Sequence, residues 1–187
     1  YYHRNEDQIA LDMVQKTLEA MRLGGIWDHV GFGFHRYSTD QRWLLPHFEK
    51  MLYDQALMAG VYLEAFQITR APLLAETATD ILTYVLRDMT DSQGGFYSAE
   101  DADSEGEEGK FYVWTTTEFQ NVLDDETARR WQTILRLSPE GNFTDEATRQ
   151  KTGANIPHLT TTLARWAQKL NVPQDQLQNE WHQVRER

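Results

Sequence analysis

The chain has 187 residues, enough for one domain, and its 40% hydrophobic and 25% charged residues are typical of a globular protein. Its net charge is −11 and its basic residues are scattered. A nucleic-acid partner is therefore not expected, because phosphate binding needs clustered Lys and Arg. The absence of Cys excludes disulfides, thiolate metal sites and cysteine nucleophiles. With no long apolar run and no signal-peptide core at the first residues, we expect a cytoplasmic protein without a membrane partner.

The first third of the chain predicts a helix, a hairpin and a second helix. Apolar residues recur at three- and four-residue steps over 5–23, which predicts an amphipathic helix. Gly24 and Gly25 follow, and we expect them to end this helix with a left-handed cap. The aromatic segment 26–38 predicts a short, irregular β-hairpin. Pro46 predicts the start of the next helix, since a missing N–H is harmless in a first turn.

The remaining elements follow the same alternation. Pro72 opens a predicted helix over 72–91, and two aromatic strands joined by an acidic loop are expected within 96–114. Thr115 and Glu118 form a capping box for a helix near 116–124. A loop is expected over 138–159. Further helices are predicted at 126–137, 158–170 and 173–187.

A repeat organises these elements. The order of helix, Gly-Gly pair, aromatic hairpin and helix occurs over 5–69 and again over 72–124, with the two Gly-Gly pairs 70 residues apart. Such a repeat predicts an array of helical hairpins, which either stacks into a solenoid or closes into an α/α toroid. Five to six helices are about half of a six-hairpin toroid, so we expect residues 1–187 to form a single segment of a larger toroid.

Long motifs carry a family resemblance. The motifs occur in this order: GGIWDHVGFGFHRYSTDQRWLLPHFEKMLYDQA, GGFYSAEDADS, GKFYVWT and, further on, GNF with TGANIPHL. Together they resemble the thioredoxin-domain-containing proteins of unknown function that include the spermatogenesis-associated member. The resemblance implies an (α/α)6 toroid like that of the N-acylglucosamine 2-epimerases and six-hairpin glycosidases. It also implies a thioredoxin-like domain in the full-length protein, which we do not expect within residues 1–187. The expected fold is thus all-α, a partial toroid with short β-hairpins at one end.

Polar residues in and around 24–54 are the candidates for a functional site. A histidine beside a carboxylate can act as acid or base near neutral pH. The candidate catalytic residues are His35, His47, Glu49 and Asp54. The candidate substrate-binding residues are Arg36, Lys50, Asp28, Trp27, Glu100 and Asp101. On the predicted helix, Lys50 and Asp54 would share a face. The alternative is an ion-pair network that only fixes the hairpin onto the start of the helix.

The aromatic residues of the two hairpins have two interpretations. Rings in a concave funnel stack on sugars, but short hairpins also pack over helix ends through aromatic side chains. Trp27 and Tyr97 occupy equivalent positions after the two Gly-Gly pairs, which favours packing for both. No cofactor motif is present, because Gly31 and Gly33 form a lone G-x-G and no phosphate loop occurs.

The acidic loop matches the first part of a calcium-binding pattern but not its last position. Residues from Asp101 onward match the opening of an EF-hand loop, but the twelfth position is Tyr112, where a bidentate Glu is required. We therefore expect no metal, with a bound divalent cation as the alternative.

Two functions from different classes follow. The first is binding and processing of a small molecule of the sugar class, in an epimerase-, isomerase- or glycosidase-like reaction by acid–base catalysis. The second is a non-catalytic binding or scaffold module that serves the thioredoxin-like domain of the full-length protein. The first predicts polar groups that face a cavity, and the second predicts polar groups paired with one another and no open pocket.

Overall fold

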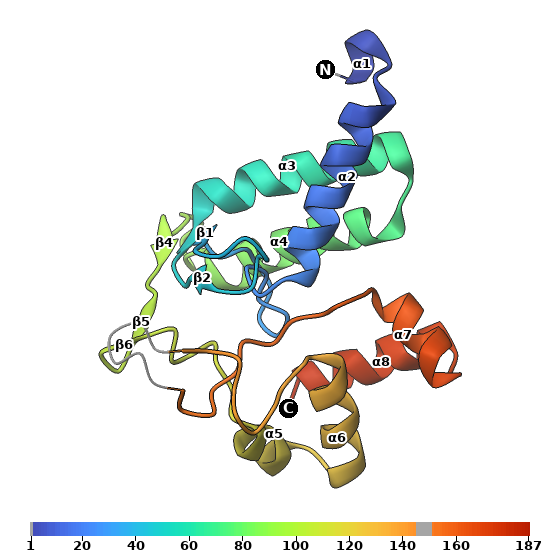
Figure 1. The fold of residues 1–187 in the computed structure, drawn as a ribbon. Helices are drawn as coiled ribbons and strands as arrows, with labels where there is room; N and C mark the ends of the chain where they lie inside the picture. Colours follow the sequence, from blue (N-terminus) through green and yellow to red (C-terminus); the bar gives the residue numbers. More distant parts are fainter. Residues whose placement is uncertain (1, 145–150) are drawn as a thin grey trace.

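The computed structural model describes residues 2–144 and 151–187, and in these it is mostly helical with short strand pairs (Figure 1). The predicted helical class is therefore confirmed. The helices are α1 Tyr2–Asn5, α2 Gln8–Leu23, α3 Leu52–Thr69, α4 Pro72–Asp88, α5 Thr116–Val122, α6 Asp125–Ile134, α7 Leu163–Leu170 and α8 Gln174–Arg185. The strands are β1 Tyr37–Ser38, β2 Pro46–His47, β3 Lys50–Met51, β4 Ala99–Glu100, β5 Asp103–Ser104 and β6 Glu107–Glu108. None of the described helices is long and apolar enough to cross a membrane.

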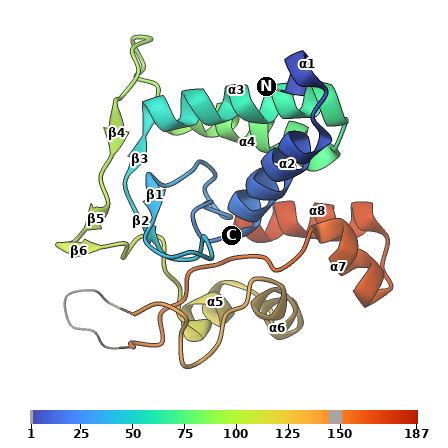
Figure 2. The ribbon, with the colours of Figure 1, turned by 45° about the horizontal axis from the view of Figure 1, so that its top comes forward.

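Helices α2, α3 and α4 form the N-terminal body. α3 and α4 are an antiparallel pair joined by Arg70, whose φ of 59° turns the chain back at the end of α3. α2 crosses this pair (Figures 1 and 2), and the Tyr62 hydroxyl donates a hydrogen bond to the Leu18 carbonyl at 2.7 Å. Their shared core holds Tyr62, Ile81 and Tyr84 together with Trp27 from the loop after α2. Burial of these large apolar groups is what stabilises the arrangement.

Three two-stranded antiparallel pairs lie at the end of the α3–α4 pair where α3 begins (Figure 1). β1 pairs with β2, β3 pairs with β4, and β5 pairs with β6. The β3–β4 pair sets Lys50 opposite Glu100, although 50 residues separate them in sequence. This long-range pair brings the two candidate segments of the sequence together.

Several local predictions were wrong at the start of α3. Pro46 lies in β2, and α3 begins only at Leu52, after β3. Lys50 and Asp54 therefore do not share a helix face, since Lys50 is in a strand.

Gly24 is the residue after α2, but its φ of −72° is not left-handed. Within the aromatic segment 26–38, Trp27 and Phe34 form an isolated bridge, and the last two residues, β1, pair with β2 outside the segment.

The acidic segment also differs from the predicted aromatic hairpin. β4 pairs with β3 rather than with a strand near Tyr112, and the hairpin that does form joins β5 to β6 through acidic residues. The predicted capping box at the start of α5 is confirmed, because Thr115 and Glu118 each bond the other's backbone N–H. The loop predicted over 138–159 includes 145–150, which lie outside the described residues.

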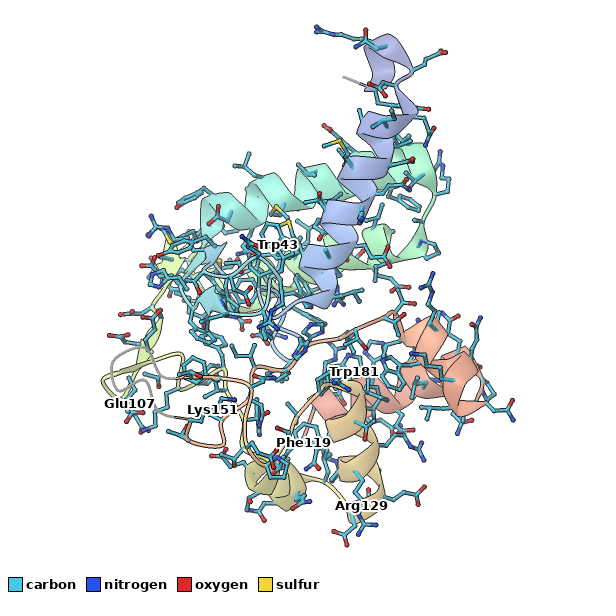
Figure 3. The ribbon with its side chains drawn as sticks, in the orientation of Figure 1. Trp43, Glu107, Phe119, Arg129, Lys151 and Trp181 are labelled. Carbon is cyan, nitrogen blue, oxygen red and sulfur yellow. The ribbon has the colours of Figure 1, made fainter. Side chains whose placement is uncertain are left out.

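Helices α5 to α8 surround a second core. Trp131 and Trp181 stack there with ring centroids 4.5 Å apart, and Phe119 packs in the same cluster. Figure 3 places Phe119 and Trp181 in this part of the molecule and Trp43 beside the N-terminal body. Residues 154–159 run between the two bodies, because Asn155 pairs with Trp114 and the Leu159 N–H donates to the Leu23 carbonyl.

Candidate functional site

A buried lysine is the central feature of the β3–β4 pair. Lys50 is 1% exposed, and its ammonium donates to the Asp28 carboxylate at 2.7 Å and to the Phe32 carbonyl at 2.8 Å. The same nitrogen lies 4.5 Å from the ring centroid of Tyr84 and 4.7 Å from that of Tyr112. A charge buried this deeply needs such partners, because an unpaired one would be strongly destabilising.

Asp28 is held by the loop that follows α2. Its second carboxylate oxygen accepts hydrogen bonds from the backbone N–H groups of Val30 and Gly31 at 2.9 and 2.8 Å. Burial opposes ionisation, but the Lys50 ammonium and these donors outweigh it and hold the pKa of Asp28 below its usual value. Asp28 therefore stays a carboxylate opposite the Lys50 ammonium.

Glu100 carries the second carboxylate of the site. Its two oxygens accept hydrogen bonds from the hydroxyl groups of Tyr84 and Tyr112, at 2.5 and 2.6 Å. Burial raises the pKa of both tyrosines, and the Glu100 carboxylate raises it further. The tyrosines are thus neutral donors, and Glu100 is their shared acceptor.

These groups line a cavity of about 570 Å³ beside the C-terminal end of α4. Its polar lining consists of Asp28, Lys50, Tyr84, Arg87, Asp88 and Glu100, and the exposed rings of Tyr97 and Phe111 also line it. The volume is in the range of small-molecule sites, roughly 300–1,000 Å³. A second cavity, of about 650 Å³, shares Asp28, Gly31 and Phe111 with the first.

Three of the sequence candidates therefore meet at one cavity, namely Asp28, Lys50 and Glu100. His35 does not line it. The His35 ring is 3% exposed, its Nδ1 bonds the Phe48 carbonyl at 2.9 Å, and it packs edge-on against Phe48 and Tyr112. Burial lowers the pKa of His35 to about 3, so the ring is neutral and carries its proton on Nδ1.

Four candidates form a separate group on the surface. Arg36 donates to the Glu49 carboxylate at 2.9 Å, and His47 lies 3.5 Å from the same carboxylate. The other ring nitrogen of His47 contacts Glu108 of β6 at 2.6 Å. Side chains alternate along an extended chain, so Glu49 points away from the buried side that Lys50 occupies. Asp54, in the first turn of α3, has one buried oxygen without a partner, and burial raises its pKa.

Two further candidates lie elsewhere. Trp27 is 1% exposed in the core of the N-terminal body, where it contacts the ring of Phe34. Asp101 is exposed, and its carboxylate accepts a hydrogen bond from the backbone N–H of Asp103. Neither residue lines one of the cavities described above.

Sequence reasoning missed the tyrosines. Neither Tyr84 on the predicted helix 72–91 nor Tyr112 in the second predicted hairpin was a candidate site residue. A buried tyrosine hydroxyl needs a hydrogen-bond partner, but only the fold shows that the partner of both is Glu100.

Among residues 2–144 and 151–187, no group of three or more His, Asp or Glu side chains is arranged to hold a metal ion. The structure thus gives the cation alternative no support.

Comparison with known proteins identifies similar chains. This chain is 54% identical to spermatogenesis-associated protein 20 of Mus musculus over 122 residues, which cover 62% of this chain and 15% of that protein. The Homo sapiens protein of the same name is 52% identical over 122 residues, covering 62% of this chain and 16% of the relative. An uncharacterized protein of Caenorhabditis elegans is 42% identical over 133 residues, which cover 65% of this chain and 18% of that protein. No family model matches the chain.

These similarities support the resemblance seen in the motifs. The matched part of the chain spans less than a fifth of the length of each of these relatives. Their names state neither a reaction nor a substrate.

Proposed function

We propose that the cavity at Lys50 binds a small polyhydroxylated molecule of the sugar class and transfers protons to and from it. The observation that carries the proposal is the buried Lys50 ammonium, which lies beside Asp28 and lines an open cavity. A pair that served only to join two segments would not need such a cavity. The proposal therefore differs from the scaffold alternative in requiring a ligand at this place.

The chemistry of the wall suits a sugar. Carboxylates accept hydrogen bonds from hydroxyl groups, and an ammonium and tyrosine hydroxyls donate them. The rings of Tyr97 and Phe111, 51% and 71% exposed, offer apolar faces for the C–H side of a sugar ring at the cavity edge. The site thus combines hydrogen-bonding groups with two exposed rings.

The same groups can move a proton in an isomerisation or epimerisation. Glu100 would remove a proton from a carbon next to a carbonyl group. Lys50 would stabilise the negative charge that develops on the carbonyl oxygen. His35 and His47, the acid–base candidates of the sequence, do not line the cavity. In this proposal they support the fold around it.

Ligand binding is tested by thermal unfolding with a panel of free aldoses, ketoses and N-acetylated amino sugars. A sugar that binds only the folded state raises the unfolding midpoint by mass action. Tyr97→Ala should remove that rise. Phe96→Ala is the matched control, because Phe96 is equally exposed, adjacent in sequence and outside the cavity lining. If no sugar raises the midpoint, or if Tyr97→Ala leaves the rise intact, the binding proposal is wrong.

Proton transfer needs its own measurement. In D2O, proton NMR would show deuterium entering the bound sugar at the carbon next to its carbonyl. Glu100→Gln keeps an acceptor for one tyrosine but removes the base, so exchange should fall while binding remains. A sugar that binds without any exchange would favour a binding module over an enzyme.

We also propose that the α3–α4 pair is one hairpin of an (α/α)6 toroid in the longer protein, in which a thioredoxin-like domain is a partner. Two features support this: the strand pairs gather at one end of the helices, and the similar proteins are several times longer. A crystal structure of the full-length protein would test it. An arrangement in which α3 and α4 are not neighbours in one ring of helices would contradict it.

A further inference from the structure

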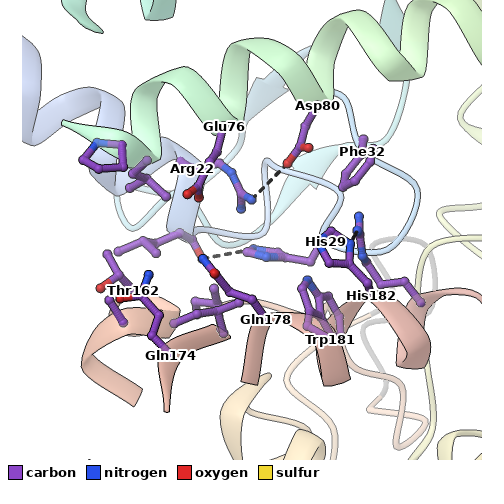
Figure 4. A pocket seen from close by; sticks show the side chains of 17 residues that line it. Arg22, His29, Phe32, Glu76, Asp80, Thr162, Gln174, Gln178, Trp181 and His182 are labelled. Carbon is purple, nitrogen blue, oxygen red and sulfur yellow. Dashed lines mark hydrogen bonds and ion pairs between the residues drawn. The ribbon is translucent and has the colours of Figure 1, made fainter. Parts of the chain in front are cut away.

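A cavity of about 470 Å³ lies between the two bodies of the molecule and shares no lining residue with the cavities at Asp28 (Figure 4). Helices α2 and α4 supply one wall, and α7 and α8 supply the other. Its apolar lining includes Leu73, Leu159, Leu163 and Trp181. Its volume is again in the range of small-molecule sites, roughly 300–1,000 Å³.

Arg22 faces this cavity from the end of α2. Its guanidinium lies 3.5 Å from the Asp80 carboxylate and 4.5 Å from the ring centroid of Trp27. Figure 4 shows Arg22 and Asp80 together on the α2–α4 side. The Nε atom of Arg22 is buried and has no hydrogen-bond partner. Because a guanidinium has five N–H donors, a single long contact with Asp80 leaves most of its capacity unused.

Arg185 reaches the same cavity from α8. Its guanidinium donates to the Nδ1 atom of His182 at 2.6 Å and lies 4.2 Å from the ring centroid of Phe32. Its Nε is also buried without a partner. Within the described residues, no carboxylate forms an ion pair with Arg185, and its attraction to Asp80 acts over a longer distance. The guanidinium is therefore uncompensated by a contacting acid.

The charges around the cavity leave an excess of positive charge beside Arg22 and Arg185. Asp80 is the acidic group there, whereas Glu76 is exposed, so water screens its charge. His29 adds no charge, because burial lowers its pKa to about 3 and its Nε2 donates to the carbonyls of Leu23 and Gly24. One carboxylate thus faces two guanidinium groups.

We propose that this cavity binds a small organic carboxylate, with its anionic group between Arg22 and Arg185 and its apolar body against Trp181 and the leucines. Guanidinium groups suit this role, because their planar N–H pairs match the two oxygens of a carboxylate. The apolar lining provides the burial that a bare inorganic anion would not use. This site is independent of the sugar site proposed at Lys50.

Benzoate is the probe for this proposal, and neutral benzamide is its matched control. Isothermal titration calorimetry on this chain should show benzoate binding and benzamide binding at least tenfold more weakly. Arg185→Gln should weaken benzoate binding about 10- to 100-fold, the equivalent of a charged hydrogen bond. Arg129→Gln, on the exposed face of α6, should leave it unchanged. Equal binding of benzoate and benzamide, or full affinity in Arg185→Gln, would overturn the proposal.

A second variant keeps the test decisive if Arg185→Gln does not fold. Gln178 lines the cavity from α8, and Gln178→Phe should fill the space while both arginines remain. Benzoate binding should then be lost, although the far-UV circular dichroism stays that of the parent chain. Benzoate binding that persists in Gln178→Phe would place the anion elsewhere and overturn the proposal. The Tyr97→Ala variant should bind benzoate normally, so failure of the sugar site does not affect this test.

Discussion

Lys50 and Asp28 form an ion pair that water hardly reaches, since their side chains are 2% and 11% exposed. Lys50→Met removes the ammonium and leaves Asp28 as a buried charge without its partner. We expect the free energy of unfolding to fall by about 3–5 kcal/mol, as for other broken buried pairs. Urea unfolding followed by circular dichroism would measure this loss.

The double variant Asp28→Asn with Lys50→Met is the control for that interpretation. It removes both charges, so it should be less destabilised than the sum of the two single variants. The difference between the sum and the double variant is the coupling free energy of the pair. Additive losses would mean that Asp28 and Lys50 do not stabilise each other, against the geometry of the 2.7 Å contact.

His29 and His35 make stability depend on pH. Burial lowers the pKa of each from 6.5 to about 3 in the folded chain. Between these values the unfolded chain binds more protons, so stability is complete above pH 6.5 and is lost as the pH falls. From pH 6.5 to about pH 5 the expected loss is about 2 kcal/mol per histidine. Urea unfolding at about pH 7 and about pH 5 would measure it.

Variants that imitate each histidine's hydrogen bond isolate this effect. The amide nitrogen of Asn stands where Nδ1 stands, so His35→Asn can still donate to the Phe48 carbonyl. By the same argument His29→Gln replaces the Nε2 donor. Each variant should lose less stability than the parent chain between the two pH values. An unchanged loss in both variants would mean that other groups cause the pH dependence.

At the residue scale the sequence proposed candidate residues but did not show which of them meet. Asp28, Lys50 and Glu100 were candidates, and all three line one cavity. His35 and His47 have the same chemical character in the sequence, yet one is buried in aromatic packing and the other lies between two surface carboxylates. Burial decides this difference, and burial depends on contacts that sequence spacing does not show.

At the element scale, the segment that follows the β5–β6 hairpin packs against the ring of Phe48 at a glycine. Gly109 has a φ of +76°, and a Cβ atom there would lie 2.4 Å from the ring of Phe48. Gly109→Ala therefore adds a clash to the strain of a positive φ. We expect it to lower the free energy of unfolding by about 2–4 kcal/mol, measured by urea unfolding.

Gly106 provides the matched control within the hairpin itself. Its φ of +81° is similar, but a Cβ atom there would have no neighbour within 4 Å. Gly106→Ala should show only the backbone strain, about 1–2 kcal/mol. The excess loss in Gly109→Ala then reports the contact with Phe48. Equal losses in the two variants would show that the segment at Gly109 is not pressed against this ring.

Local signals set some element boundaries and not others. The capping box at Thr115 and the proline at the start of α4 act within one turn, so the sequence predicted both. Pro46 carries the same signal as Pro72, but its segment instead pairs with β1. The next two residues of strand, Lys50 and Met51, pair with β4. Long-range pairing overrode local propensity there, and a two-residue strand has no periodicity to reveal it.

At the scale of the whole molecule, residues 154–159 join the two bodies. Ile156 is buried in a cluster with Phe48 and Tyr112, next to the close approach of Gly25 to Leu44. The Leu159 N–H donates to the Leu23 carbonyl at the end of α2. Leu159 itself is buried in the core of α5–α8. A segment that packs in that core and bonds the end of α2 should make the two bodies unfold together.

Ile134→Ala tests whether they do. Ile134 is 1% exposed in the core of α5–α8, and its truncation should cost about 2–5 kcal/mol. If the chain unfolds as one unit, the slowest amide protons of α3 exchange only by global unfolding. Their protection, measured by native-state hydrogen exchange, should then fall by the same free energy as the urea transition. Val122→Ala, at a half-exposed position on α5, should change neither value appreciably.

The alternative outcome is equally specific. Unchanged protection in α3, with lowered protection in α6 and α8, would mean that the N-terminal body is stable when the C-terminal body opens. Such opening would also separate the two walls of the cavity at Arg22 and Arg185, because α2 and α4 form one wall and α7 and α8 the other. Benzoate binds only the closed form in our proposal, so it should then raise the protection of α6 and α8 and leave that of α3 unchanged. With one cooperative unit, benzoate should raise the protection of both bodies by the same free energy.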